Sequence, residues 1–460
     1  MITIEHSNSR IPERQYIFKV IFEDILGTEW KAVVNNSLEQ ETILYTTSAE
    51  NSISIPDKLF SIPDQDWLHK NSMPLEPLEK IYLKKYQLST HNNLEKIPVV
   101  YGNLKSSKYD FPIDIFGSCF FLITRYEENV TPAFDKHNRF PSSASLACRE
   151  HFLERPLVNE YAYLLWQMLM KLNSGINQKK SKYRFYVSCD VDVPFDDSLW
   201  KKKFLFRKVA GDLLKRRSSV SAIQSIKKYL NAQQEGIIAD PFNTFDWMMD
   251  QNEKNNVILS CYFITNHSSN LDGTYHVSEK RIQSLMKTIH ARGHNLGLHG
   301  SYNSYNNASI LMKEAKILFS LCDNLKISQN KWGGRQHVLR YDNNNTLINW
   351  EKAGFDYDST LGYADHIGFR TSCCSPHSTF SLMERRNIGI KERPLMAMEQ
   401  TLAAQRYMGL GFSVDFFDRI ISIFKTVKYY GGEFSLLWHN SNFTLPNSKE
   451  IYSQILAECS

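Results

Sequence analysis

The hydrophobic pattern divides the chain into two parts with different rhythms. Up to about residue 175, short apolar runs alternate with polar loops, as at 16–22, 41–47 and 96–102. We interpret these runs as strands. An apolar stripe with helical spacing predicts a helix over 155–173; its members are Leu157, Tyr161, Leu164, Leu165 and Met168. This part is expected to be a smaller α+β domain.

From residue 183 the pattern changes to apolar strands that alternate with amphipathic helices. The predicted strands lie at 183–189, 257–265, 295–299, 355–361 and 433–439. The predicted helices lie at 278–292, 308–324, 343–354 and 413–432. This alternation is typical of a parallel sheet or barrel. The polar, basic segment 174–182 has the composition of a linker, so we predict two domains, 1–175 and 183–460.

Composition places the chain among ordinary globular proteins. It has 460 residues, of which 42% are hydrophobic and 22% are charged, as is usual for soluble domains. The first residues lack the apolar core of a signal peptide. The eight cysteines form no CxxC pair, which favours reduced thiols. We therefore expect a cytoplasmic protein.

A basic insertion interrupts the second part at about residues 201–230. It holds ten Lys and Arg residues against one Asp, whereas the net charge of the whole chain is only +5. One interpretation is a helix with a solvated basic face. The other is a docking surface for an anionic partner such as a membrane of acidic lipids. No nucleic-acid recognition motif accompanies the insertion, so we do not expect nucleic acid to bind.

Polar residues with catalytic chemistry follow several of the predicted strands. In chain order they are Asp190, Asp192, His299, Asn303, Arg335, His337, Asp358 and His439. A single Asp after a strand is commonly a turn or cap residue. In a parallel barrel, however, the carboxyl ends of the strands meet at one face. The recurrence of such residues with the strand–helix rhythm therefore predicts one shared pocket.

The motifs CDVD, LHGSYN, RQHVLRY and LLWHN, in this order, resemble those of the polysaccharide deacetylase family, the NodB-homology domain of carbohydrate esterase family 4. The resemblance covers about residues 183–445. It implies a distorted (β/α) barrel that removes acetyl groups from an amino sugar or related glycan. It also implies a divalent metal as cofactor, with zinc as the first candidate.

By this resemblance three residues carry the catalytic steps. Asp190 is implied as the base, Arg335 as the residue that orients it, and His439 as the general acid. Amide hydrolysis needs an activated water, a stabilised oxyanion and a proton for the leaving amine. A bound divalent metal lowers the pKa of water towards about 7 and polarises the carbonyl. The predicted residues provide the proton transfers.

The implied metal ligands are Asp192, His299 and Asn303, but Asn303 stands where the family has a second histidine. An amide oxygen binds zinc more weakly than an imidazole does. Asn303 is then a weak ligand, or the metal is held by Asp192 and His299 with water or with Asp196 or His366. The third alternative is a site that has lost its metal and binds glycans without catalysis.

Side chains in and near the motif loops are candidates for substrate contact. They are Tyr302, His337, Asp358, Tyr363 and Trp438. The partner expected from the resemblance is a carbohydrate substrate or a glycan precursor, since a cytoplasmic chain meets precursors before finished polymers. The competing hypothesis is a non-catalytic glycan-binding or scaffold protein of a surface-polysaccharide pathway.

Overall fold

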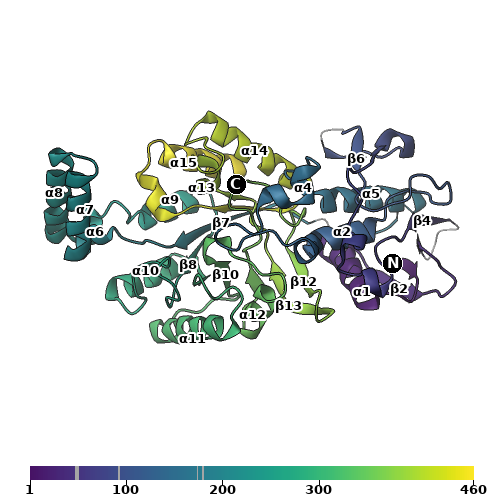
Figure 1. Ribbon diagram of the computed structural model, residues 1–460, viewed down its shortest axis with the longest axis horizontal. Helices are drawn as coiled ribbons and strands as arrows, with labels where there is room; N and C mark the ends of the chain where they lie inside the picture. The colour runs from purple at the N-terminus through teal and green to yellow at the C-terminus, as the bar shows by residue number, and fades with distance from the viewer. Residues whose placement is uncertain (47–50, 92–93, 174, 179–180) are drawn as a thin grey trace.

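The computed structural model describes residues 1–46, 51–91, 94–173, 175–178 and 181–460. Its elements fall into three groups along the longest axis (Figure 1). The N-terminal region lies at one end, a large sheet with its helices lies in the middle, and the helices α7 and α8 lie at the other end.

The large sheet contains nine strands in the order β12-β13-β11-β10-β9-β8-β7-β15-β14. In chain order they are β7 (Arg184–Val191), β8 (Leu259–Phe263), β9 (Asn295–Gly300), β10 (Gly333–Gln336), β11 (Tyr357–Asp358), β12 (His377–Ser381), β13 (Arg386–Glu392), β14 (Ala397–Met398) and β15 (Glu433–Leu437). All neighbouring pairs are parallel except β12 and β13. The predicted α/β class is therefore confirmed.

Helices lie between and after these strands, and they include the four that the hydrophobic pattern predicts, at 278–292, 308–324, 343–354 and 413–432. They are α9 (Phe245–Lys254), α10 (Lys280–Ala291), α11 (Ala308–Leu325), α12 (Thr346–Lys352), α13 (Glu399–Ala403), α14 (Val414–Tyr429) and α15 (Ser448–Cys459). Their apolar stripes, such as Ile282, Met286 and Ile289 of α10, are buried against the sheet. The basic insertion forms α6 (Asp197–Trp200), α7 (Lys202–Leu214), α8 (Ser219–Glu235) and a short turn, η7 (Gly236–Ala239).

The sheet curls so strongly that side chains from distant strands meet inside it. Tyr186 lies on β7 and Tyr357 on β11, with β8, β9 and β10 between them. Their hydroxyl oxygens are nevertheless 3.2 Å apart, and the hydroxyl of Tyr262 on β8 lies 3.3 Å from that of Tyr357. Gly333 makes room for this layer, because a Cβ there would lie 2.5 Å from the Tyr357 ring. Among the described residues no pairing joins β12 to β14, so the sheet is a half-barrel and not the closed ring of a full barrel.

The N-terminal region has a small sheet of its own, in the order β2-β1-β3-β4. Its strands are β1 (Ile2–His6), β2 (Trp30–Val34), β3 (Glu41–Thr46) and β4 (Ser52–Pro56), and a separate pair is formed by β5 (Lys80–Tyr82) and β6 (Lys96–Pro98). Its helices are α1 (Ile11–Lys19), η1 (Val20–Ile25), α2 (Ile115–Ile123), α3 (Tyr126–Val130), α4 (Leu146–Arg149) and α5 (Leu157–Leu172). The helix predicted over 155–173 is thus present as α5.

Residues 16–22 are helical, and the strand interpretation of this run is wrong. The run covers the end of α1 and the start of the π-helix η1. Every side chain in it except Lys19 is buried. A continuous apolar run does not distinguish a buried strand from a buried helix, because neither leaves a polar face. The run at 96–102 is extended only over Lys96–Pro98, and Thr47 lies outside the described residues.

The N-terminal region packs closely against the β12–β13 edge of the large sheet. Its hydrophobic core incorporates side chains from beyond residue 360, namely Tyr363, Cys373, Phe380 and Leu382. The Tyr16 hydroxyl donates to the Ser378 carbonyl at 3.0 Å, and Arg385 Nε lies 2.7 Å from Glu13 Oε1. The two parts therefore share a core across their seam. The boundary at 174–182 stays a prediction, and positions 174, 179 and 180 lie outside the described residues.

Candidate active site

Residues predicted at the strand ends lie together at the carboxyl edge of the curled sheet. Asp190 is in β7, and Asp192 follows the last residue of that strand. His299 of β9 pairs in register with Arg335 of the neighbouring β10. His439 follows β15, which pairs with β7 on its other side. The parallel sheet thus brings these five side chains to one edge.

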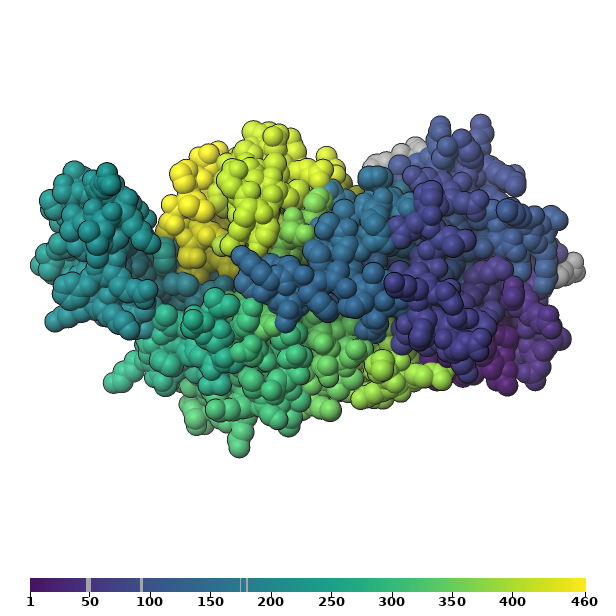
Figure 2. All heavy atoms as spheres, in the orientation of Figure 1, coloured from purple at the N-terminus to yellow at the C-terminus, as the bar shows by residue number. Residues whose placement is uncertain are grey.

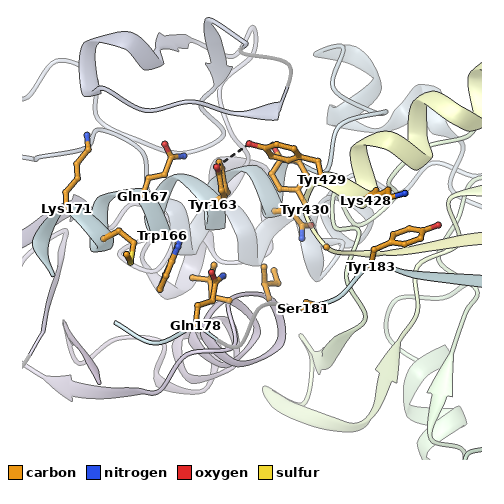
Figure 3. A pocket seen from close by; sticks show the side chains of 15 residues that line it. Tyr163, Trp166, Gln167, Lys171, Gln178, Ser181, Tyr183, Lys428, Tyr429 and Tyr430 are labelled. Atoms are coloured by element: carbon orange, nitrogen blue, oxygen red, sulfur yellow. Dashed lines mark hydrogen bonds between the residues drawn. The ribbon is translucent and has the colours of Figure 1, made fainter. Parts of the chain in front are cut away.

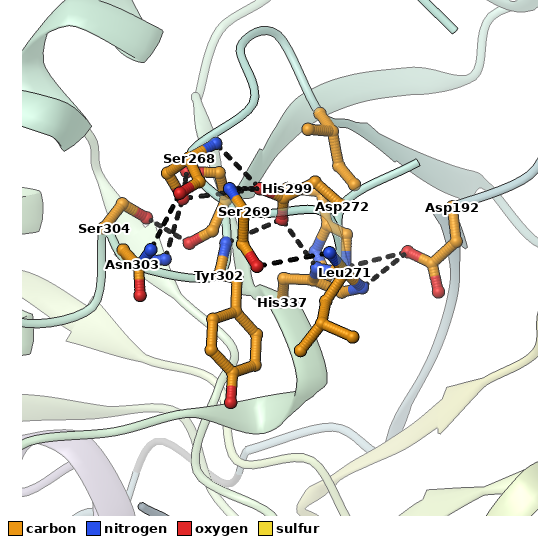
Figure 4. Close-up of polar contacts among 12 residues, drawn as sticks. Asp192, Ser268, Ser269, Leu271, Asp272, His299, Tyr302, Asn303, Ser304 and His337 are labelled. Carbon is orange, nitrogen blue, oxygen red and sulfur yellow. Dashed lines mark hydrogen bonds and ion pairs between the residues drawn. The ribbon is translucent and has the colours of Figure 1, made fainter. Parts of the chain in front are cut away.

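A candidate metal centre is formed by Asp192, His299 and His337, whose ligand atoms all lie within 4.8 Å of one another. Nε2 of His299 lies 3.2 Å from Oδ1 of Asp192, and Nε2 of His337 lies 3.6 Å from the same oxygen. Figure 4 shows both imidazole rings directed at this carboxylate. Oδ1 is buried without a well-formed hydrogen bond. Two imidazoles and a carboxylate are a donor set that catalytic zinc sites use, so the residues fit a divalent metal.

The two histidines of this group are held by contacts on their other ring nitrogen. Nδ1 of His299 lies 2.9 Å from the carbonyl oxygen of Arg335. Nδ1 of His337 lies 2.9 Å from Oδ1 of Asp272. When each Nδ1 carries the proton, each Nε2 keeps its lone pair and can bind a metal. Contacts of the other ring nitrogen with a carbonyl or carboxylate oxygen are usual for metal-binding histidines.

Asp272 is itself fixed by the backbone around it. Its Oδ2 accepts hydrogen bonds from the amides of Ser268 and Ser269, both at 2.8 Å. Its Oδ1 accepts from the amide of Tyr302 at 2.7 Å as well as contacting His337. Burial by itself raises the pKa of Asp272, but these contacts outweigh it and lower that pKa. The ring of His337 is therefore oriented by a charged, immobile carboxylate (Figure 4).

His439 faces the other oxygen of the same carboxylate. Its Nε2 lies 3.6 Å from Oδ2 of Asp192, and its Nδ1 lies 2.6 Å from Oε1 of Glu399. Burial by itself lowers the pKa of His439, but Glu399 and Asp192 outweigh it and raise that pKa to about 10. His439 is thus a protonated imidazole at neutral pH, which is the form that a general acid requires.

Asp190 is paired with a buried cation. Arg335 is fully buried, and one of its terminal nitrogens lies 2.7 Å from Oδ1 of Asp190. The same guanidinium donates to the Ser188 hydroxyl and the Ser359 carbonyl, which fixes its plane. The second oxygen of Asp190 lies 3.8 Å from Nε2 of His299. Asp190 therefore stands beside the metal centre with one oxygen held and the other turned towards it.

Asp192 has the electrostatics of a metal ligand. Burial by itself raises the pKa of its carboxyl group, but His337, His299 and His439 outweigh this and hold that pKa well below its usual range. The carboxylate is therefore ionised across the physiological range of pH. Ligands must be deprotonated to bind a metal, so no proton has to be displaced from this oxygen.

These groups line a cavity of about 180 Å³. Its walls comprise Arg139, Asp190, Asp192, His299, His337, Val338, Leu339, Met398, Gln400, Arg406, Tyr407, Leu437 and His439. Asp190 and His439 are the catalytic candidates among them, while Arg139 comes from the N-terminal region. The cavity thus requires both parts of the chain.

The wall after His337 has an uncommon backbone conformation. Val338 and Leu339 have φ angles of 61° and 57°, and a β-branched residue rarely adopts this left-handed region. Arg139 donates to the Val338 carbonyl at 3.0 Å, and Arg340 donates to the His137 carbonyl at 2.8 Å. The N-terminal region therefore holds this strained segment in place, as strain at a functional site requires.

Asn303, the third metal ligand implied by the sequence, lies outside the metal centre. Its amide nitrogen donates to the carbonyl of Ser268 at 2.8 Å, and its Oδ1 accepts from Arg340 at 3.3 Å. Figure 4 shows the amide directed away from Asp192. The amide is engaged in holding two loops together, and the imidazole of His337 is present in its stead.

The alternative ligands have other partners as well. Asp196 caps α6 and lies 2.8 Å from Nζ of Lys208. His366 lies 3.9 Å from Glu154, and its Nδ1 contacts the carbonyl oxygen of Ile367. Neither side chain lines the cavity.

Three side chains expected to contact a substrate are buried elsewhere. Trp438 is fully buried and stacks on Phe412 and Phe443; because side chains alternate along a strand, its neighbour Leu437 faces the cavity instead. The Tyr363 hydroxyl accepts from Arg125 at the seam. Asp358 is fully buried.

The remaining two predicted contacts lie near the metal centre. The hydroxyl of Tyr302 lies 3.1 Å from Nδ1 of His137, and its ring lies 4.0 Å from the Arg340 guanidinium. Tyr302 thus joins the motif loop to the N-terminal region. His337, expected to contact substrate, belongs to the metal group.

Three functional candidates have no clear signal in the sequence. Asp272 stands in a loop and Glu399 begins the helix α13, neither in a recognisable motif, and they reach the histidines only through the fold. Arg139 lies in the segment DKHNRFP. Among the other residues that line the cavity, only Asp190 and Asp192 lie within 150 positions of it in the sequence. The position of His337, two residues after Arg335, is the one signal that could have found its role.

A larger cavity of about 660 Å³ lies between α5 and α14 (Figure 3). Aromatic rings line it, among them Tyr163, Trp166 and Tyr429. Its polar side chains are already engaged, since Gln167 bonds to Ser89 and the Tyr429 hydroxyl donates to that of Tyr163. Among the described residues no acid, histidine or cysteine lines it.

One family model and two solved structures resemble parts of this chain. Residues 2–174 match the model of a family of unknown function (DUF7033), which is fewer than half of the residues of the chain. No curated protein matches the chain. A solved structure from Mycobacterium smegmatis, assigned as a polysaccharide deacetylase, is 12% identical over 61% of this chain and 85% of its own, with a TM-score of 0.37. The structure of Puue Allantoinase is 11% identical with the same coverage and TM-score. Neither likeness is close enough to support a statement about function.

Proposed function

We propose that this protein is a metal-dependent hydrolase of the deacetylase type, which removes an acetyl group from an amino sugar or a related glycan. The observation that carries the proposal is the arrangement around Asp192. Two histidine nitrogens face one oxygen of this carboxylate, His439 faces its other oxygen, and the buried Asp190–Arg335 pair lies beside His299.

The metal is proposed to bind Asp192, His299 and His337, with zinc as the first candidate. When bound, it would polarise the acetyl carbonyl and make a water molecule more acidic. Asp190, held by Arg335, accepts the proton of the attacking water. A bond forms between the water oxygen and the carbonyl carbon, and the carbon–nitrogen bond breaks. His439 gives its proton to the leaving nitrogen, so the products are acetate and a free amine.

The neighbours of the acid and the base support these roles. Arg335 keeps Asp190 in one orientation through a buried contact of 2.7 Å. Glu399 does the same for His439 through a contact of 2.6 Å. Preorganised groups of this kind lower a barrier because they need no rearrangement during the reaction. The cavity of about 180 Å³ is proposed to admit an acetamido group with part of one sugar ring.

The proposal is tested by elemental analysis of the protein purified without added metal, together with acetate release from N-acetylated sugars and their oligomers. We expect about one divalent ion per chain, bound through three protein ligands, and acetate release that is abolished in Asp190→Asn. A chain that holds no metal and binds saccharides without turnover would instead be the glycan-binding protein of the competing hypothesis. That hypothesis is motivated by Asn303 and by the large N-terminal domain; the proposal of His337 as a second imidazole ligand argues against the first of these.

A further inference from the structure

The hairpin of α7 and α8, residues 202–235, projects from the body of the molecule. Figure 1 shows it at the end of the long axis opposite to the N-terminal region, and Figure 2 shows it as a separate knob. It is tied to the body at its base, where Lys201 donates to the Thr274 carbonyl at 2.8 Å and the Arg281 guanidinium of α10 lies 5.7 Å from the Trp200 ring. The knob is therefore attached firmly and yet exposed on most of its surface.

Exposed apolar side chains run along both helices of the hairpin. On α8 they recur at intervals of three and four residues, which places them on one face; they are Val220, Ile223, Ile226 and Leu230, with exposed fractions of 64, 54, 42 and 53%. On α7 they are Phe206, Leu213 and Leu214, with 70, 47 and 79%. Ile238 follows with 88%. Apolar side chains gathered in this way on a soluble protein indicate an interaction surface.

The same two helices are rich in cations. Residues 201–230 contain ten Lys and Arg residues and one Asp. That single carboxylate, Asp212, is already engaged by Arg216 and by the Ser225 hydroxyl. Among the described residues no acidic partner is found for Lys202, Lys203, Arg207, Lys227 or Lys228 on the hairpin. The surface is therefore both apolar and strongly positive.

We propose that this hairpin docks the protein on the surface of an anionic lipid bilayer. Apolar side chains that enter the boundary of the acyl chains, flanked by Lys and Arg at the headgroups, are the two features of a helix that lies in a membrane surface. No helix among the described residues has the length and apolar content to cross a bilayer, so the docking is peripheral. Each cation near an acidic membrane contributes about 1 kcal/mol of attraction.

The charge of the hairpin favours a membrane over the other occupants of such a surface. A second copy of this chain would set the nine cations of one hairpin against the nine of the other, with only Asp212 and Glu235 on each hairpin to offset them. A nucleic acid would satisfy the cations but would leave the exposed Phe206, Leu214 and Ile223 in water. An anionic bilayer matches both the charge and the apolar side chains.

The test uses the full chain in a flotation assay with two kinds of vesicle. One kind is pure phosphatidylcholine, and the other contains about one third phosphatidylglycerol. We expect binding to the second kind only, with loss of binding as salt is raised from about 0.1 to 0.5 M. The assay needs no substrate and no metal, so its outcome is independent of the proposed function.

Two variants separate the two contributions. The charge variant changes Lys202, Lys203, Arg207, Lys227 and Lys228 to Gln, and the apolar variant changes Phe206, Leu214, Ile223 and Leu230 to Ser. We expect each to weaken binding at least about tenfold. The charge control neutralises exposed cations on α10, on α11 and directly after α11, namely Lys280, Lys287, Lys313, Lys316 and Lys326. The apolar control changes Ile258, Met312, Met383 and Val414, which are also exposed; both controls are expected to bind as the unchanged chain does.

Three results would overturn the proposal. The first is equal binding to both kinds of vesicle or to neither. The second is binding by the charge variant that equals that of its control. The third is a dimer of the unchanged chain that the apolar variant converts to a monomer in light scattering, which would make the hairpin a contact between copies. Because the charge variant retains every buried residue of the hairpin, it keeps the test decisive if the apolar variant fails to fold.

Discussion

Nε2 of His337 lies 3.6 Å from Oδ1 of Asp192, although β8 and β9 separate the two strands that these residues follow. The contact exists because the sheet curls and the backbone turns sharply after β10, where Val338 has a φ of 61°. It brings a second imidazole to the metal centre from outside the LHGSYN motif. The first three predictions concern this centre and its surroundings.

Replacement of His337 is expected to impair metal binding, whereas replacement of Asn303 is not. His337→Ala removes one of the three ligand candidates, and we expect the affinity for zinc to fall at least about 100-fold. Asn303→Ala removes an amide that contacts Ser268 and Arg340, and we expect the affinity to stay unchanged. Titration calorimetry with zinc measures both. If zinc binding were lost in Asn303→Ala and kept in His337→Ala, Asn303 would be the ligand and His337 would not.

Replacement of Asp190 is expected to abolish turnover and retain the metal. Asp190→Asn keeps the shape of the side chain but removes the base, so kcat should fall by about 100- to 10,000-fold. It also leaves the buried Arg335 without its counter-ion, which is expected to cost about 3–5 kcal/mol of unfolding free energy. Acetate release, metal content and urea unfolding are measured on the same preparation. Full activity with normal stability would remove Asp190 from the mechanism.

His439 is expected to titrate far above the ordinary range of histidine in the metal-free protein. Glu399 and Asp192 raise its pKa to about 10 from a reference value of 6.5. Because the raised pKa belongs to the folded state, its stabilising contribution is full below about pH 6.5 and is lost as pH rises through about 10. Glu399→Gln should lower the pKa of His439, and nuclear magnetic resonance of the ring protons measures it. An unchanged pKa in this variant would exclude Glu399 as the cause.

Arg139 is expected to support the site from the N-terminal region. Arg139→Met removes the donor to the Val338 carbonyl and the partner of Asp135, and we expect kcat/KM to fall about tenfold and stability to fall by about 1–3 kcal/mol. The matched control is Arg149→Met, which breaks an exposed pair with Glu76 and should leave kcat/KM unchanged. Equal losses in both variants would show that the N-terminal region acts on overall stability alone.

Asp358 is expected to make stability depend on pH, in contrast to the substrate contact that the sequence suggests. Burial raises its pKa to about 6 from 3.8, and the buried Glu392 beside it also has a raised pKa. The folded state therefore binds the proton more tightly, so this contribution is full below about pH 3.8 and is lost as pH rises through about 6. Asp358→Asn has no carboxyl group that ionises at this position, so its unfolding free energy should not show this loss.

Urea unfolding at several values of pH between these limits measures the effect. The unfolding free energy of the unchanged chain minus that of Asp358→Asn should fall by up to about 3 kcal/mol as pH rises. A difference that stays constant with pH would mean that Asp358 ionises as freely in the folded chain as in the unfolded one.

Local sequence patterns account for the elements and for part of the site. The helices α10, α11, α12 and α14 follow from apolar side chains at helical spacing, and the strands β7, β8, β9, β11 and β15 follow from short apolar runs between them. The placement of Asp192 and His299 at one edge follows from this alternation, and they lie 3.2 Å apart. The strand prediction at 16–22 is wrong because a segment buried on all faces has no polar face to reveal its period.

The sequence by itself determined the α/β order of the elements and the residue types at the strand ends, because both depend on neighbours a few positions away. Only the tertiary structure decided that His337 and not Asn303 faces Asp192, that Glu399 and Asp272 hold the histidines, and that Arg139 closes the cavity. Asp190 and Arg335 are 145 residues apart in the chain and 2.7 Å apart in space. The curl of the sheet and the packing of the N-terminal region fix such contacts, and neither leaves a periodic trace in the sequence.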